Sequence, residues 1–532
     1  MRNYIKKAYI YMVVPAISLI FTACQPDFEA INTDHRHPTE NDLQKDGLKA
    51  GGYLTTFQQS IFPVGSSGTN YVNDYQIPYT LAGASWIGYM APAQNKWVGK
   101  GFPTYGLRAW SNYTYNVMAG TPLRYWMDFK KRTTDDAAAF ALAQIIKVVA
   151  VHKATDTFGP MPYSQTGKEG VLQSVYDSQQ DVYKQMLREL DEAVATLDKE
   201  AHNILPQYDI IYEGDYKKWM KFANSLMLRL AMRVVYADEA LAKTYAEKAI
   251  SNPQGVFEVA KDMAQLSKGA GVTLKNPLVI INNDYNDVRM GAEIYSYLKG
   301  YEDPRIASYF VQATIGGVTD YYAVRTNLPS KTDYLDKKSF STLNVENSTP
   351  VYIMKTSEVY FLRAEGALRN WNMGSGTAQA FYEKGITTSF EENGLAASAA
   401  MAYVANSTAK PAKYVDPVNS EYSKDAATDI TIKWTSTDTF EKNLERIITQ
   451  KYLAIYPDGQ EAWSEFRRTG YPKIFTPVLI ATDADVAGYG PTRIPYSNEE
   501  YNKNLENITK AVTLLGGADN GATKVWWDKK KK

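Results

Sequence analysis

The sequence predicts a mainly α-helical protein, a divergent solenoid of the tetratricopeptide type whose helix pairs are interrupted by long, aromatic-rich loops. One observation is that segments with apolar residues at three- and four-residue steps recur along the chain, mostly in pairs. In such a solenoid each helix pair buries its apolar face against its neighbour. The other observation is that stretches rich in Gly, Asn, Thr and Tyr separate these pairs, chiefly residues 62–120, 255–334 and 393–438. Loops of that length in a compact protein are usually functional or disordered, and their many aromatic residues favour function.

The first residues have the layout of a secretory signal. Arg2, Lys6 and Lys7 give a cationic start, and the apolar run that follows, 8–21, is too short to span a bilayer. The single cysteine, Cys24, comes directly after two small residues, as in the signal of a bacterial lipoprotein. We therefore expect residues 1–23 to be a signal peptide and Cys24 to carry a lipid. A plain signal peptide with an incidental cysteine is the alternative.

Residues 24–44 are expected to be a lipidated tether, and residues 45–532 a single α-helical domain whose loop insertions bind the ligand. The tether is polar and acidic, so it has little reason to fold alone. His35 and His37 lie within it, but no third ligand is near them in the sequence, and we expect no metal site.

Eight segments are expected to be helices because their apolar residues fall on one face. The first has Thr134 and Asp135 as candidate caps, and the second opens with a variant of a capping box, Ser174 to Asp177. The segments are 135–155, 174–197, 215–235, 239–250, 355–369, 377–390, 440–456 and 460–468.

Charge balance and residue supply argue against nucleic-acid binding and against catalysis. Lys+Arg and Asp+Glu are equal at 58 each, which leaves no general field for a nucleic acid. The only cysteine is destined for a lipid, and the four histidines supply no Ser-His-Asp arrangement. No glycine-rich stretch completes the phosphate-binding pattern G-x-G-x-x-G. We expect no enzymatic activity and no cofactor. Glycoside hydrolysis, which needs only two carboxylates, stays as the enzymatic alternative.

A set of short motifs occurs in order along the chain, including Gly159-Pro-Met-Pro-Tyr163, Asp303-Pro-Arg305 and Arg467-Arg-Thr-Gly-Tyr-Pro472. The full set lies at 154–163, 219–233, 298–305, 358–365, 450–453, 459–463, 467–472 and 525–528. Together with the signal around Cys24, this ordered set resembles the SusD/RagB family of Bacteroidetes outer-membrane lipoproteins.

The resemblance implies a SusD-like fold and a nutrient-binding role at the cell surface. It implies a lipid-anchored protein on the outer membrane, facing outward, that captures an oligosaccharide and delivers it to a SusC-like TonB-dependent transporter. Peptide capture on the same scaffold is the main alternative, and a non-binding envelope adaptor is a further one.

Two of these motifs are also expected to hold the scaffold together. Arg467 and Arg468 lie close in sequence to Glu461 and Glu465, which favours buried or half-buried ion pairs. Asp303 precedes Pro304, a turn starter, with Arg305 as its expected partner.

The ligand site is expected among the aromatic residues of the first insertion. An aromatic ring removes the C–H face of a sugar from water, while neighbouring amides and carboxylates bind its hydroxyls. We predict Trp97 as the platform and Asn95 as its polar neighbour, with a second side of the site from the loop Asp284, Tyr285 and Asn286. Trp110 and Tyr113, at helical spacing, are expected in the core instead. The residues predicted to flank the platform are Trp86, Tyr89 and Tyr105.

Overall fold

The computed structural model describes residues 47–92, 97, 101–171, 175–269, 272–328, 339–478, 488 and 490–531. Residues 52–532 form one compact unit. The other unit, residues 1–51, contributes only the start of one helix to the described residues. The predicted signal peptide, tether, Cys24 and Asn95 lie outside the described residues, so the predictions about them stay predictions.

All eight predicted helices are present, and the mainly helical fold class is confirmed. Most of their ends differ from the predicted ones by only a few residues. The helices are α8 (Ala137–Phe158), α9 (Gln179–Glu200), α10 (Tyr216–Arg233), α11 (Glu239–Ser251), α15 (Thr356–Leu368), α16 (Ala378–Glu392), α18 (Phe440–Ala454) and α19 (Gly459–Thr469).

The caps explain where the first helices begin. The side chain of Asp136 accepts a hydrogen bond from the backbone N–H of Ala139 at 2.9 Å, so α8 starts one residue later than its predicted caps. The predicted capping box at the start of α9 is wrong. Ser178 is the N-cap there, and its hydroxyl accepts from the backbone N–H of Asp181 at 3.1 Å.

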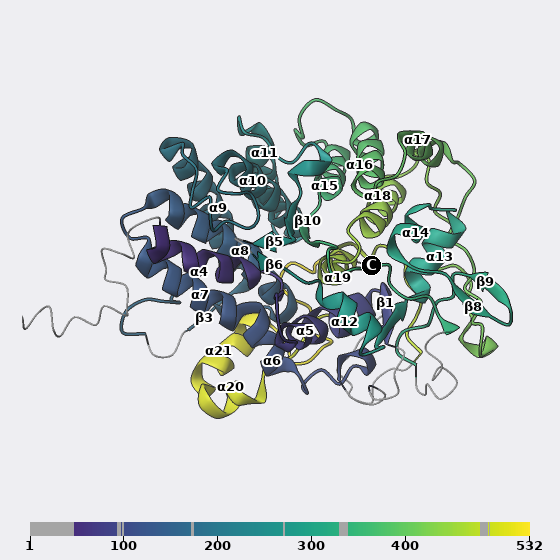
Figure 1. The fold of residues 1–532 in the computed structure, drawn as a ribbon, viewed down its shortest axis with the longest axis horizontal. Helices are drawn as coiled ribbons and strands as arrows, with labels where there is room; N and C mark the ends of the chain where they lie inside the picture. Colours follow the sequence, from purple (N-terminus) through teal and green to yellow (C-terminus); the bar gives the residue numbers. More distant parts are fainter. Residues whose placement is uncertain are drawn as a thin grey trace, which may run out of the picture. The chain divides into compact units, whose positions relative to one another are not determined.

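The helices pack in consecutive antiparallel neighbours, as a solenoid requires. Helix α8 packs on α9, α9 on α10 and α10 on α11; further along the chain α15 packs on both α16 and α18. Helix α10 also contacts α15, and this contact joins the two groups into one array (Figure 1).

Helix α8 is the core of the first group. Its length and mean hydropathy of 1.5 would suit a membrane span, but 83% of that stretch is buried inside the protein. It is the one such helix in the part of the chain that the structure describes. Its burial identifies it as a core helix.

The insertions contain more regular structure than the loops that were predicted. The described part of the stretch 62–120 holds two short α-helices, two π-helices and a 3-10 helix, and its glycines allow close packing. A Cβ on Gly83 would lie 2.6 Å from the side chain of Gln460, so π-helix η2 and α19 can approach only with glycine at this position. The remaining helical segments are α4 (Leu48–Gln59), α5 (Asn70–Tyr75), η2 (Gln76–Ala84), η4 (Phe102–Thr104), α6 (Ser111–Tyr115), η5 (Asn116–Gly120), α7 (Thr121–Arg132), η6 (Ala260–Asp262), α12 (Pro277–Asn283), α13 (Ala292–Gly300), α14 (Arg305–Tyr309), α17 (Ala397–Ala405), η9 (Ser420–Tyr422), α20 (Asn498–Lys503) and α21 (Leu505–Leu515).

Strands are short and form antiparallel pairs. The pair β1–β7 sets Met90 opposite Met290 and so joins the first insertion to the second. The pairs are β1 (Met90–Pro92) with β7 (Val288–Met290), β2 (Met161–Pro162) with β3 (Tyr176–Asp177), β4 (Ala264–Leu266) with β10 (Val351–Met354), β5 (Lys268–Gly269) with β6 (Val272–Thr273), and β8 (Ala313–Ile315) with β9 (Val318–Asp320).

A buried ionic network ties helices α10, α15 and α19 together at the centre of the array. Arg229 of α10 binds both carboxylate oxygens of Glu358 in α15, at 2.8 and 2.6 Å. Arg233, one turn further on, donates to Glu461 and to Glu465 of α19. Such a network holds the helices in one arrangement because separating them would leave buried charges unpaired.

The ion-pair predictions are confirmed in two cases and wrong in one. Arg468 donates to Glu465 and to Glu365, and Arg305 is held by Asp303 at 2.6 to 3.2 Å. Arg467 instead donates to backbone carbonyls and lies over the ring of Trp463, with its guanidinium carbon 3.4 Å from the ring centroid.

Candidate functional site

Trp97 lies half-buried between the two insertions. Its ring N–H donates a hydrogen bond of 2.8 Å to the carboxylate of Asp287, and its backbone carbonyl accepts one of 2.9 Å from the hydroxyl of Thr104. These two bonds fix the rotation of the indole and the path of the backbone. The ring is therefore preorganised, which lowers the entropy lost when a ligand binds.

A second indole supports the first one. The ring of Trp110 meets that of Trp97 edge to face, with centroids 5.2 Å apart and planes at 80°. Trp110 can reach this place only because Gly101 has no side chain: a Cβ there would lie 2.3 Å from the Trp110 ring. Gly101 also has φ of +68°, a conformation that favours glycine.

The prediction that Trp110 and Tyr113 are core residues is wrong. Trp110 is half-buried and Tyr113 is 37% exposed. The hydroxyl of Tyr113 donates to Asp74 of α5, two residues before the start of η2. Helical spacing suggested a buried face, but α6 is only one turn long and lies at the surface.

The loop Asp284 to Asn286, predicted as the second side of the site, directly precedes Asp287, the residue that binds the ring of Trp97. It connects α12 to β7; Asp284 is exposed, while Tyr285 and Asn286 are half-buried. Asn286 takes a left-handed conformation with φ of +50°, and its side-chain oxygen accepts from Arg289 at 3.1 Å. That these residues bind a ligand stays a prediction.

Asp287 is the residue that joins the two halves of the site, and the sequence reasoning missed it. Its carboxylate is buried and binds Trp97 with one oxygen and the amide of Gln76, at 2.6 Å, with the other. The sequence did contain a signal for this residue: Asp287 directly follows Asn286 and ends the polar run from which Asp284 and Asn286 were chosen.

Trp86, Tyr89 and Tyr105 do not flank an exposed platform in the structure; they are core side chains. Trp86 packs against Trp463 with ring centroids 4.7 Å apart. Tyr89 is fully buried and stacks on Tyr452 at 4.6 Å, with its hydroxyl bound to the Tyr452 carbonyl. Tyr105 is 5% exposed, and burial raises the pKa of its hydroxyl above the ordinary value. We therefore expect these three residues to support the site from behind, without direct ligand contact.

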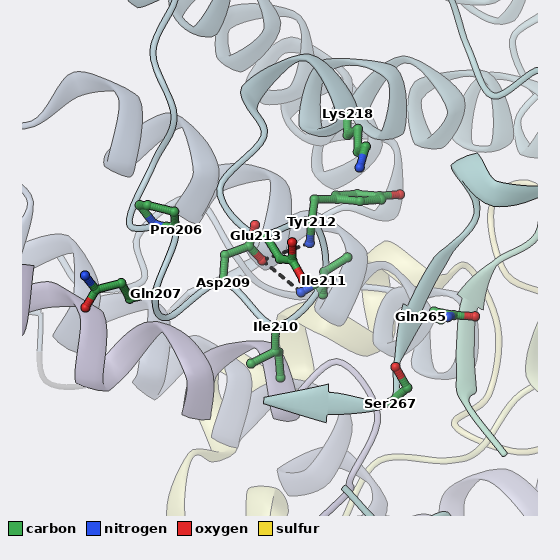
Figure 2. A pocket seen from close by; sticks show the side chains of 10 residues that line it. All are labelled: Pro206, Gln207, Asp209, Ile210, Ile211, Tyr212, Glu213, Lys218, Gln265 and Ser267. Atoms are coloured by element: carbon green, nitrogen blue, oxygen red, sulfur yellow. Dashed lines mark hydrogen bonds between the residues drawn. The ribbon is translucent and has the colours of Figure 1, made fainter. Parts of the chain in front are cut away.

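A separate cavity of about 640 Å³ opens beside the start of α10 (Figure 2). Tyr212 and Lys218 line it on one side, and Gln265 and Ser267 on the other. None of the predicted site residues lines this cavity. Its lining residues are Pro206, Gln207, Asp209, Ile210, Ile211, Tyr212, Glu213, Lys218, Gln265 and Ser267.

The wall of this cavity is held by one carboxylate. Asp209 accepts from Gln58 at 2.7 Å, from Trp219 at 2.7 Å and from the backbone N–H of Gly214 at 2.8 Å. Tyr212 is buried, and its hydroxyl donates to a backbone carbonyl. The cavity thus offers polar rims without an exposed aromatic ring, which makes it a poorer candidate for stacking a sugar than Trp97.

The acidic residues that the structure describes bear on two kinds of chemistry, a metal site and a general acid. Within those residues no group of three His, Cys, Asp or Glu side chains is arranged to hold a metal ion. The buried carboxylates Glu358, Glu365, Glu461 and Glu465 are all engaged by Arg or Lys. Burial alone would raise the pKa of Glu461, but Arg233, Lys451 and Arg229 outweigh it and hold that pKa well below the usual range. A carboxyl kept ionised in this way cannot serve as a general acid.

Comparison with known proteins gives a consistent result over nearly the whole chain. A family model described as "Susd and RagB outer membrane lipoprotein" matches residues 30–528. A chitin-binding SusD homologue from Flavobacterium johnsoniae is 38% identical, with a TM-score of 0.84, covering 90% of this chain and 98% of that one. No curated protein was found to match the sequence.

Other solved structures are similar to the same extent. A SusD homologue from Bacteroides thetaiotaomicron is 36% identical with a TM-score of 0.81, covering 91% of this chain and 99% of its own. One from Bacteroides vulgatus is 32% identical with a TM-score of 0.84, covering 93% and 99%.

Proposed function

Because the chain belongs to the SusD-like family of outer-membrane lipoproteins, we propose that it binds oligosaccharides at the cell surface and passes them to a SusC-like TonB-dependent transporter. The observation that carries the proposal is the half-buried indole of Trp97, oriented by Asp287 beside the polar loop 284–286. An oriented ring next to amide and carboxylate groups suits the apolar face and polar rim of a sugar.

The chemistry of binding follows from these side chains. The face of the Trp97 ring excludes water from the C–H face of one sugar unit. We propose that Asp284 and the amide of Asn286 bind its hydroxyl groups. Asn95, which lies near Trp97 in the sequence, is proposed as a further polar contact. Binding requires no covalent step, and we propose that the protein does not hydrolyse the ligand.

The similarity to a chitin-binding homologue makes oligomers of N-acetylglucosamine the first ligands to test. We expect purified full-length protein in detergent to bind chito-oligosaccharides on a glycan array. A parallel peptide array covers the main alternative. Binding to peptides with no binding to any glycan would overturn the proposal in favour of peptide capture.

Lipid anchoring is proposed through Cys24. Stable attachment to a membrane needs more than one acyl chain, which the modified cysteine of a lipoprotein supplies. In cells fed labelled palmitate, we expect the wild-type protein to be labelled and the Cys24→Ser variant to carry no label. Equal labelling of both proteins would contradict the anchor.

A further inference from the structure

A small cavity lies against helix α5, which contributes Tyr71 and Asp74 to its wall. It has a volume of about 160 Å³, the share of roughly five water molecules in the liquid. Helices α4, α5 and α7 and the π-helix η5 form its walls. Its lining residues are Thr56, Gln59, Ser60, Pro63, Val64, Tyr71, Asp74, Val117, Thr121 and Tyr125.

The hydroxyl of Tyr71, which lines this cavity, has no hydrogen-bond partner. Tyr71 is 8% exposed, and its oxygen is buried without a partner among the described residues. A buried polar group that is left unpaired destabilises the folded state, so each such group requires an explanation. A ligand hydroxyl or carbonyl placed in the cavity would satisfy it.

The other walls have the chemistry that a sugar ring requires. Tyr125 contributes a half-buried aromatic ring, while Gln59 and Thr121 contribute an amide and a hydroxyl. Asp74 already accepts from Tyr113, and a carboxylate has acceptor sites for further donors. The cavity therefore combines an apolar surface with several hydrogen-bonding groups, as small-molecule sites do.

Two chains of contacts link this cavity to Trp97. Asp74 is two residues before Gln76, about 3 Å along a helix axis, and Gln76 binds the same Asp287 carboxylate that holds Trp97. Separately, the ring of Trp97 contacts the ring of Trp110. Helix α6 begins directly after Trp110, and its Tyr113 donates a hydrogen bond to Asp74. The partly exposed Trp110 and Tyr113 thus link the cavity and the platform along the surface, while Gln76 and Asp287 link them through buried contacts.

We propose that the Tyr71 cavity is a second subsite of this surface, which takes one hydroxyl-rich ring of an oligosaccharide whose other units lie on Trp97. This inference rests on the proposed function. It predicts discrimination by length, because only an oligomer long enough to reach both places gains the contacts of the cavity.

Tyr71→Phe tests the subsite because it removes one oxygen and keeps the ring. Titration calorimetry with chitobiose and chitohexaose on the full-length protein measures the effect. We expect the variant to bind chitohexaose about fivefold more weakly, the loss of one hydrogen bond, and chitobiose unchanged. Trp97→Ala should weaken the binding of both ligands.

Thermal melting of the same variants separates a ligand role from a structural one. No described protein group pairs with the hydroxyl of Tyr71, so Tyr71→Phe should melt at the wild-type temperature or above. Tyr245→Phe, which removes a hydroxyl from α11, is the matched control and should leave binding and melting unchanged.

Two results would overturn the subsite while leaving the proposed function in place. One is wild-type affinity of Tyr71→Phe for chitohexaose. The other is a melting temperature below that of Tyr245→Phe, which would make Tyr71 a structural residue. If the wild-type protein binds neither oligomer, the chitin-type function fails, and the subsite fails with it.

Discussion

The orientation of Trp97 depends on a carboxylate that lies 190 residues further along the chain. The sequence predicts Trp97 and the polar loop as site residues, because an aromatic among glycines and a run of Asn and Asp are local signals. It could not identify Asp287 as their link, since only the fold brings the two insertions together through β1 and β7. For the same reason it placed Trp86 and Tyr89 at the surface, although they are packed against α19 and α18.

At the residue scale, His152 should make stability depend on pH. It is fully buried in α8, and one ring nitrogen bonds to the carbonyl of Val149 at 2.9 Å. Burial, together with nearby Arg229 and Lys153, lowers the pKa of this imidazole well below its ordinary value. Below about pH 6.5 the unfolded chain therefore binds a proton that the folded protein does not, and stability falls as the pH is lowered.

Urea unfolding at pH 7.5 and pH 5.5 measures this effect. His152→Leu should lose less stability over that range than the wild type, by about 1.4 kcal/mol. His202→Leu, at an exposed histidine, is the control and should behave as the wild type. An identical loss in His152→Leu and in the wild type would show that His152 titrates normally.

At the element scale, the helices of the array could be predicted because their apolar residues repeat at helical steps. Helices α4 and α7 were missed. Helix α4 contains two adjacent glycines, which read as a loop signal, whereas α7 does carry buried apolar residues at three-residue steps, Leu123, Trp126 and Phe129. The glycines of the first insertion were interpreted as loop signals. Gly83 instead allows α19 to pack closely against η2, and Gly101 leaves room for the ring of Trp110. These are tertiary contacts, which a local sequence pattern cannot show.

Helix α10 offers a direct test of capping. Asp215 accepts hydrogen bonds from the backbone N–H groups of Lys217 and Lys218, at 3.0 and 3.1 Å. Asp215→Ala should lower the free energy of unfolding by about 1 kcal/mol in urea titrations. Asp198→Ala, near the end of α9, removes a carboxylate from the unfavourable end of a helix and should cause no loss. Equal effects of the two changes would argue against the cap.

At the scale of the whole molecule, the array depends on the charges buried between α10, α15, α18 and α19. Arg233 donates to Glu461 and Glu465, and Lys451 lies 3.2 Å from Glu461. The sequence indicated charged pairs within α19 but could not show that they join helices more than 200 residues apart.

Arg233→Met should lower the free energy of unfolding by about 3–5 kcal/mol, because it leaves two buried carboxylates short of a partner. Lys510→Met breaks an exposed pair with Glu506 on α21 and should have no measurable effect. Denaturant unfolding of the two variants compares them directly. A stability of Arg233→Met equal to that of the wild type would mean that the network does not hold the array together.

Trp97→Ala tests whether Trp97 is the platform of a glycan site. Trp97→Ala is measured twice on the full-length protein: for its affinity toward chitohexaose by calorimetry and for its melting temperature. Loss of an aromatic anchor commonly costs about 2 kcal/mol or more, so we expect binding at least roughly thirtyfold weaker. Because Trp97 is only half-buried, its melting temperature should fall far less than for a core Trp→Ala change, which typically costs about 3–5 kcal/mol. Normal binding with a much lower melting temperature would make Trp97 a core residue and contradict the site.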